Sequence, residues 1–92
     1  MSDTLNENFL KCVDNVVNLS KRPDEDELLI LYGLYKQALF GNCNIECPEF
    51  YKFTERKKYN AWNELKDLDM ETAKKKYIRE VKLLIMKYGL DG

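Results

Sequence analysis

The sequence predicts an all-α fold of four helices, and three observations lead to that prediction. Apolar residues recur every three or four positions along most of the 92-residue chain, which is the spacing of one face of a helix. Glycine, proline and asparagine gather at the breaks between these stretches, and no stretch alternates apolar and polar residues as a half-buried strand does. A single domain over residues 1–92 is expected, because separate cores of fewer than about 40 residues are rarely stable without staples.

The first two helices are predicted from one apolar stripe and one set of acidic residues. The first covers about residues 4–19 and ends before Pro23, because the residue before a proline disfavours the α region. Four acidic residues at 24–27 then open the second helix, where negative charge favours the positive end of the helix dipole. This helix is expected to end near Phe40, before a glycine. The stripe of the first helix consists of Leu5, Phe9, Cys12, Val13 and Val16.

The last two helices follow a long loop at residues 41–51. The third, about residues 52–65, has the poorest periodicity, and its expected inward residues are Ala61, Trp62 and Leu65. Asp67 or Asp69 is expected to cap the fourth helix, which runs to about Tyr88 before a glycine. Its stripe is the clearest in the chain and consists of Ala73, Tyr77, Val81, Leu84, Ile85 and Tyr88.

The composition excludes several functional classes. Fifteen basic and sixteen acidic residues leave a net charge of −1, unlike the strongly basic domains that bind nucleic acid. The absence of histidine removes the commonest general base and metal ligand, so no metal and no cofactor are expected. An odd number of cysteines, with no signal core at the start, favours a reduced, cytoplasmic protein. Cys43 and Cys47 are a weak zinc signal without further ligands.

One face of the second helix suggests a binding site. At about 100° per residue, Tyr32, Tyr35 and Lys36 lie within one arc, with Leu28 and Leu39 between them. Two aromatic planes, a cation and an apolar floor suit a ligand with a flat ring, a phosphate and an aliphatic chain. An acyl-CoA ester has all three. Buried tyrosines beside a surface lysine remain the alternative interpretation.

Leu31, Leu34 and Ala38 on another side of the helix are enough to bury the helix in a bundle, so this face is either not needed for packing or packs against a second neighbour. If neighbouring helices pack antiparallel, Lys58 of the third helix and Tyr77 of the fourth could meet Lys36 around one phosphate.

The chain resembles the acyl-CoA-binding protein family over nearly its whole length. The resemblance rests on Tyr-x-x-Tyr-Lys-Gln-Ala with a following Gly-Asn at 32–42, on the Asn-Ala-Trp run after Lys58, and on the ending at residues 76–89. It implies an up-down-down-up four-helix bundle that binds medium- and long-chain acyl-CoA esters with high affinity. It also implies a non-enzymatic role as an intracellular acyl-CoA carrier and pool former for lipid metabolism.

The resemblance assigns roles to individual residues. Tyr35 would stack on the adenine ring, and Tyr32 would contact the nucleotide through its hydroxyl. Lys36 and Lys58 would neutralise the ribose 3′-phosphate, with help from Tyr77. Leu28 stands where the family has an apolar residue that lines the acyl end of the groove. The remaining candidate ligand-binding residues are Cys12, Val13 and Val16 on the first helix and Gly33, Leu34 and Leu39 on the second.

The sequence departs from the family at five positions. Val17 stands where many members carry a ligand-binding lysine, and Leu39 and Phe40 replace a usual threonine and valine. Tyr59 replaces a tryptophan, and Glu49 replaces a glycine after Pro48. These changes leave the preferred acyl-chain length open.

Two other functional classes remain as alternatives. An enzyme acting on CoA thioesters would need a positioned base and an oxyanion hole, for which the sequence offers no residues. A helical protein-interaction module would keep the bundle without the ligand. A monomer is expected, because no spare apolar face remains once the groove is assigned. Lys74, Lys75, Lys76 and Arg79 are expected to form a solvated face, with contact to an anionic membrane as the alternative, and contacts with acyl-CoA-using enzymes would be transient.

Overall fold

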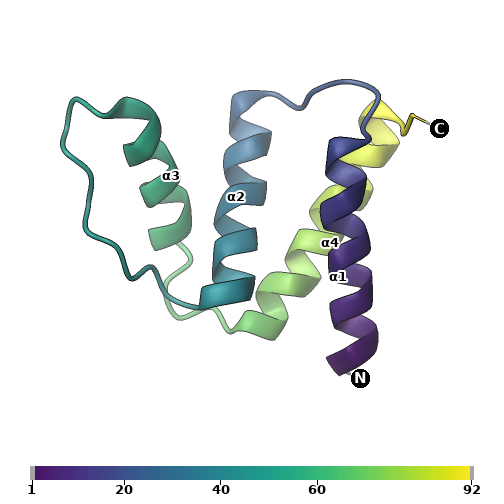
Figure 1. Ribbon diagram of the computed structural model, residues 1–92, viewed down its shortest axis with the longest axis horizontal. Helices are drawn as coiled ribbons and strands as arrows, with labels where there is room; N and C mark the ends of the chain where they lie inside the picture. The colour runs from purple at the N-terminus through teal and green to yellow at the C-terminus, as the bar shows by residue number, and fades with distance from the viewer. Residues whose placement is uncertain (1, 92) are drawn as a thin grey trace.

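The computed structural model describes residues 2–91 and confirms the all-α prediction. Four helices run up, down, down and up, and a long loop carries the chain back between the second and third (Figure 1). The helices are α1 (Ser2–Val17), α2 (Glu25–Phe40), α3 (Phe53–Asn63) and α4 (Met70–Tyr88).

The starts of α2 and α4 follow from their capping residues. The backbone N–H of Glu27 donates to the Asp24 carboxylate at 2.8 Å, and the Glu27 side chain accepts from the Asp24 N–H at 2.9 Å. This reciprocal pair is a capping box. At the start of α4, Asp69 accepts from the N–H of Thr72 at 2.9 Å. Asp69 is therefore the cap, whereas Asp67 has a φ of 70° and belongs to the preceding turn.

Two helices end earlier than the sequence suggested. The first ends at Val17 instead of residue 19, and the third ends at Asn63 instead of residue 65. In the first case, the backbone N–H of Ser20 donates to the carbonyl of Gly89 at 2.8 Å, and that of Asp91 donates to the carbonyl of Asn18 at 2.8 Å. These bonds to the C-terminal segment draw the chain out of the helix. The expected boundary took no account of these partners at the other end of the chain.

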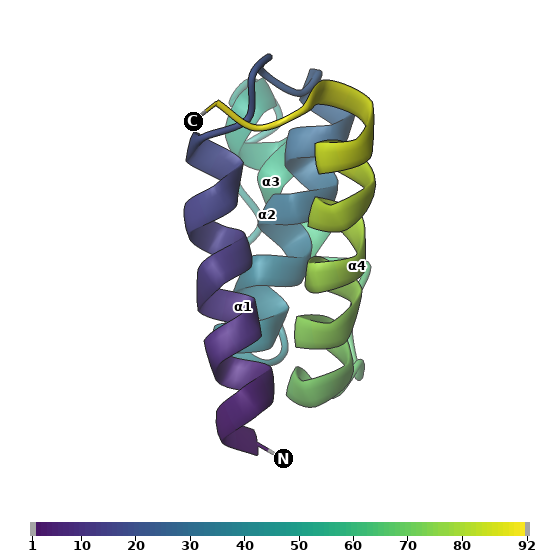
Figure 2. The same cartoon turned by 90° about the vertical axis from the view of Figure 1, so that its right-hand side faces the viewer.

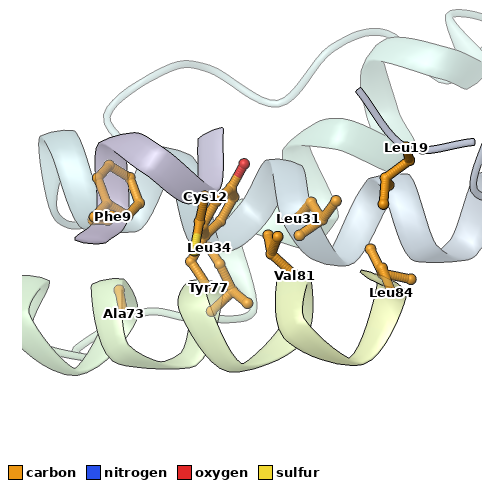
Figure 3. Packing of buried hydrophobic residues seen from close by; sticks show 10 residues of the cluster. Phe9, Cys12, Leu19, Leu31, Leu34, Ala73, Tyr77, Val81 and Leu84 are labelled. Atoms are coloured by element: carbon orange, nitrogen blue, oxygen red, sulfur yellow. The ribbon is translucent and has the colours of Figure 1, made fainter. Parts of the chain in front are cut away.

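The helices form a flat assembly in which α2 and α4 are central. α2 packs between α3 and α4, and α1 packs against α4 (Figures 1 and 2). The Cα trace spans 40 × 32 × 15 Å. α1 and α2 make no close backbone contact, so side chains fill the space between them. The core consists of Phe9, Cys12, Leu19, Leu31, Leu34, Ala38, Ala73, Tyr77, Val81 and Leu84 (Figure 3).

Glu27 ties the start of α2 to the end of α4. Its carboxylate accepts from Lys87 Nζ at 2.8 Å and from the hydroxyl of Tyr88. These hydrogen bonds, with that from the Asp24 backbone, lower the pKa of Glu27 to about 2. The same contacts raise the pKa of Lys87. The acidic start of α2 therefore does more than favour the helix dipole, because one of its residues also joins two helices.

The opposite end of α2 is closed by side-chain hydrogen bonds to backbone groups. Gln37 is fully buried, and its Nε2 donates to the carbonyl of Leu68 at 2.7 Å. Trp62 Nε1 donates to the carbonyl of Gly41 at 2.8 Å. The Asn42 side chain accepts from the backbone N–H of Asp67 at 2.7 Å. These bonds hold the C-terminal end of α2 against α3 and the turn that precedes α4.

Within the described residues, none of the four helices has the length and apolar character needed to cross a membrane.

Candidate ligand-binding groove

Two adjoining hollows lie where the amino ends of α2 and α3 meet the turn between α1 and α2. The first has a volume of about 360 Å³ and is bounded by α2, α3 and that turn. The second, of about 380 Å³, shares Arg22, Pro23 and Leu28 with the first and extends to α1. We call the two together the groove. Its other lining residues are Val16, Val17, Leu19, Lys21, Glu25, Leu29, Tyr32, Thr54, Lys57 and Lys58.

Two lysines from different helices converge on the ring of Tyr32 at the edge of the groove. Lys36 Nζ lies 5.7 Å from the ring centroid, and Lys58 Nζ lies 5.5 Å from it. Lys36 also lies over the rings of Phe40, at 5.0 Å, and Trp62, at 5.7 Å. Among residues 2–91, neither lysine has a carboxylate partner. Two positive charges without a counter-ion beside aromatic rings form a site that favours an anion.

Tyr35 and Tyr77 form a second aromatic cluster with Phe9 of α1. The Phe9 and Tyr35 rings stack with centroids 6.1 Å apart, and Phe9 meets Tyr77 edge-on at 5.0 Å. Tyr35 and Tyr77 lie 6.3 Å apart. Tyr77 is buried and extends from α4 toward Cys12 (Figure 3). Burial, followed by the proximity of Cys12 and Tyr35, raises the pKa of Tyr77 to about 12, so its hydroxyl remains protonated at neutral pH.

The other candidate residues line the groove, pack in the core or are exposed. Leu28 and Val16 line the groove itself. Cys12 is buried in the core, where burial raises the pKa of its thiol against the lowering effect of Lys82. Val13 is half-buried and packs against the same core, and Leu39 is exposed on the far part of α2.

Gly33 and Leu34 lie away from the groove. A Cβ atom on Gly33 would lie 2.5 Å from the carbonyl oxygen of Ala61, so α2 and α3 touch through this glycine. Leu34 is buried in the core and borders a further hollow of about 430 Å³ between α2 and α3, which shares Leu29 and Lys57 with the groove. The structure thus gives these two residues packing roles.

Sequence reasoning missed several groove residues and one aromatic neighbour. Pro23 was expected only to end the first helix, and Arg22, Leu29, Thr54 and Lys57 were not among the candidate binding residues. The sequence did contain an indication of these residues. Leu29 is adjacent to Leu28, and Lys21 and Arg22 lie just before the helix that carries Tyr32 and Tyr35. Phe9 had been assigned only to the stripe of the first helix, and no local pattern shows that it reaches Tyr35.

Two departures from the family pattern border the site. Val17 is strongly exposed and lines the part of the groove next to α1. Phe40 is exposed and carries the ammonium group of Lys36 over its ring. The first places an apolar side chain where a charge is usual, and the second adds an aromatic support for a site lysine.

Comparisons with known proteins agree on one family. The family model described as Acyl CoA binding protein matches residues 6–81. An acyl-CoA-binding protein from Dictyostelium discoideum is 45% identical over 81 residues, covering 88% of this chain and 96% of the relative.

Solved structures of the same family share the fold. The crystal structure of Oryza sativa acyl-CoA-binding protein 2 superimposes with a TM-score of 0.89 at 31% identity, covering 94% of each chain. The solution structure of the acyl coenzyme A binding protein from yeast has a TM-score of 0.69 at 39% identity, covering 97% of this chain and 99% of that one.

Proposed function

Because the chain belongs to the acyl-CoA-binding protein family, we propose that it binds medium- and long-chain acyl-CoA esters in the groove. Residues 1–92 would act as one binding domain and serve as an intracellular carrier and pool former for lipid metabolism. The family is one of binding proteins and not of enzymes, so the thioester leaves the groove unchanged.

The convergence of Lys36 and Lys58 on Tyr32 is the observation that carries this proposal. The 3′-phosphate of coenzyme A supplies the negative charge that these ammonium groups lack among the described residues. A hydrogen bond to a charged group contributes about 1.5–3 kcal/mol. Two such lysines on different helices also fix where the phosphate lies, and so they orient the rest of the ligand.

The aromatic cluster next to these lysines is suited to the nucleotide. Tyr35 is half-buried, so part of its ring remains accessible for stacking on adenine, which contributes about 1–3 kcal/mol per base. Its packing against Phe9 fixes the ring before the ligand arrives. Tyr77 retains its proton at neutral pH, so its hydroxyl is a hydrogen-bond donor available to the phosphate.

The apolar part of the groove is suited to the acyl chain. Leu28, Leu29 and Val16 supply aliphatic surface, with Val17 extending it along α1. Each methylene removed from water contributes up to about 0.8 kcal/mol. The acyl chain therefore supplies most of the affinity, and the nucleotide contacts supply orientation. With Val17 in place of a lysine, we expect affinity to depend more on chain length.

We place the carrier in the cytoplasm as a monomer. Its three cysteines are unpaired, as is usual in a reducing compartment.

A thermal-shift experiment tests the proposed function. A ligand that binds only the folded state raises the melting temperature, and the rise grows with affinity. We expect free CoA to give the smallest rise and the C8, C16 and C18 esters larger ones. No rise with any ester would contradict the proposal and favour a protein-interaction module. Disappearance of the thioester during incubation would instead indicate an enzyme.

A further inference from the structure

Three aromatic side chains are exposed at the junction of the long loop and α3. Phe50, Tyr51 and Phe53 are 78%, 55% and 72% exposed, and we call these three residues the aromatic tip. The expectation that no spare apolar face would remain is therefore wrong at this place. Large exposed apolar patches mark surfaces that contact another molecule.

The backbone of the loop fixes the aromatic tip in position. Arg56 Nη1 donates to the carbonyl of Pro48 at 3.0 Å, and the backbone N–H of Lys52 donates to the carbonyl of Glu49 at 2.9 Å. The rings of Phe50 and Tyr51 meet edge to face at 5.7 Å. The rings are thus held outward by an ordered turn, although none of the three is buried.

The aromatic tip lies at the mouth of the groove. Thr54, the residue after Phe53, lines the groove together with Lys57 and Lys58 on the same helix. The loop brings the tip to the amino end of α3, which lies at the same end of the molecule as the amino end of α2 (Figure 1). If Phe53 contacts a surface, an acyl chain that leaves this surface would therefore reach the groove within one turn of α3.

One cation lies within the aromatic tip, and others line the groove beside it. Lys52 lies within the tip, and Lys21, Arg22 and Lys58 line the adjoining groove. None of these four has a carboxylate partner among residues 2–91, whereas Lys57 is paired with Glu25 at 2.9 Å. Glu49 and Glu55 are the acidic residues nearest in sequence.

The lysine run of α4 offers a weaker surface of this kind. Lys74 Nζ donates to the Asn6 side chain at 2.6 Å, and Lys75 lies 3.5 Å from the carboxylate of Glu71. Aromatic rings with unpaired cations are typical of proteins that lie in the headgroup region of a bilayer, with the rings at the boundary of the acyl chains.

We propose that the aromatic tip docks the protein on an anionic phospholipid membrane, with the mouth of the groove facing the lipid. Phe50 and Phe53 insert between the headgroups, and Lys52 with the cations of the groove contacts the lipid phosphates. This inference rests on the proposed function, because an acyl-CoA ester is held in a membrane by its chain. Docking at this end lets the chain pass into the groove without crossing bulk water.

Co-sedimentation with vesicles tests the docking. The vesicles consist of phosphatidylcholine alone or mixed with phosphatidylserine, and the double variant Phe50→Ser with Phe53→Ser is compared with wild type. We expect wild type to bind the mixed vesicles more tightly than the neutral ones, and the double variant to bind the mixed ones about tenfold more weakly. The matched control is Leu83→Ser with Met86→Ser, which removes apolar side chains 51% and 83% exposed on α4 and is expected to bind like wild type.

The docking proposal would be overturned by wild type that binds neither kind of vesicle, or by a double variant that binds as well as wild type. A dimer that dissociates in the double variant would also overturn it, because the tip would then contact a second copy. Palmitoyl-CoA titrations without vesicles keep the two proposals apart. We expect equal affinity in all three proteins. Failure of all three to bind would contradict the proposed function, and the vesicle result would still decide the docking.

Discussion

The two ends of the α2–α3 pair differ in how they are filled. Gly33, in the middle of α2, brings the backbones into contact, and at the carboxyl end Trp62 and Gln37 bond to backbone carbonyls on neighbouring segments. At the amino end, the groove lies between the helices, and a single exposed ion pair, Glu25–Lys57, crosses the gap. The difference shows how a small bundle can keep an open site. Packing and hydrogen bonds at one end of the α2–α3 pair are firm enough to keep the two helices apart at the other end.

Removing Trp62 should have the largest effect on the closed end. Its side chain is only 3% exposed, so Trp62→Ala is expected to lower the free energy of unfolding by about 3–5 kcal/mol. Denaturant titration followed by circular dichroism measures this loss. Trp62→Phe is the milder control, because it keeps an aromatic ring while it loses the hydrogen bond to Gly41 and part of the buried ring volume. A small loss in the alanine variant would show that this end does not hold the pair together.

Removing a site lysine should weaken ligand binding and leave stability almost unchanged. Lys36→Ala is expected to weaken palmitoyl-CoA binding by about 1.5–3 kcal/mol, or roughly ten- to a hundredfold, with little change in stability. Titration calorimetry gives the dissociation constant. Lys66→Ala, an exposed lysine in the turn after α3, is the matched control and should bind like wild type. An unchanged constant for Lys36→Ala would remove this residue from the site.

Gly33 tests whether the close contact matters. Gly33→Ala places a methyl group against the Ala61 carbonyl, which should cost about 1–3 kcal/mol through overpacking. Alanine gains only about 1 kcal/mol over glycine in a helix, so we expect a net loss of stability. A higher melting temperature would mean that the helices can separate freely at this point.

Acid should weaken the link between α2 and α4. The folded-state pKa of Glu27, about 2, lies below its ordinary value of 4.5. The contribution of Glu27 is therefore fully present above about pH 4.5 and is lost as the pH falls toward 2. Wild type should melt above Glu27→Gln at neutral pH, and the two melting temperatures should converge in acid. If the melting temperatures of the two proteins instead differed by the same amount from neutral pH to pH 2, Glu27 would not be the group that links α2 to α4.

The sequence predicted the helices well where local patterns decide them. The stripe of α4 and the acidic start of α2 both mark real elements, because capping and periodicity act over a few residues. The choice between Asp67 and Asp69 stayed open, since either spacing allows a cap. It depends on Asn42, which precedes α3 in the chain and accepts a hydrogen bond from the backbone N–H of Asp67, which follows α3.

The site was only partly predictable for a similar reason. Tyr32, Lys36 and Leu28 share a face of one helix, and periodicity alone brings them together. The approach of Lys58, and the contact of Phe9 with Tyr35, depend on how separate helices pack. The exposure of the aromatic tip depends on the path of the long loop, for which no periodic pattern exists.

The structure of the complex with palmitoyl-CoA tests the central claim most directly. We predict the 3′-phosphate between the ammonium groups of Lys36 and Lys58, adenine against the ring of Tyr35, and the acyl chain along Leu28. A nucleotide bound away from Tyr32 and these two lysines would contradict the account.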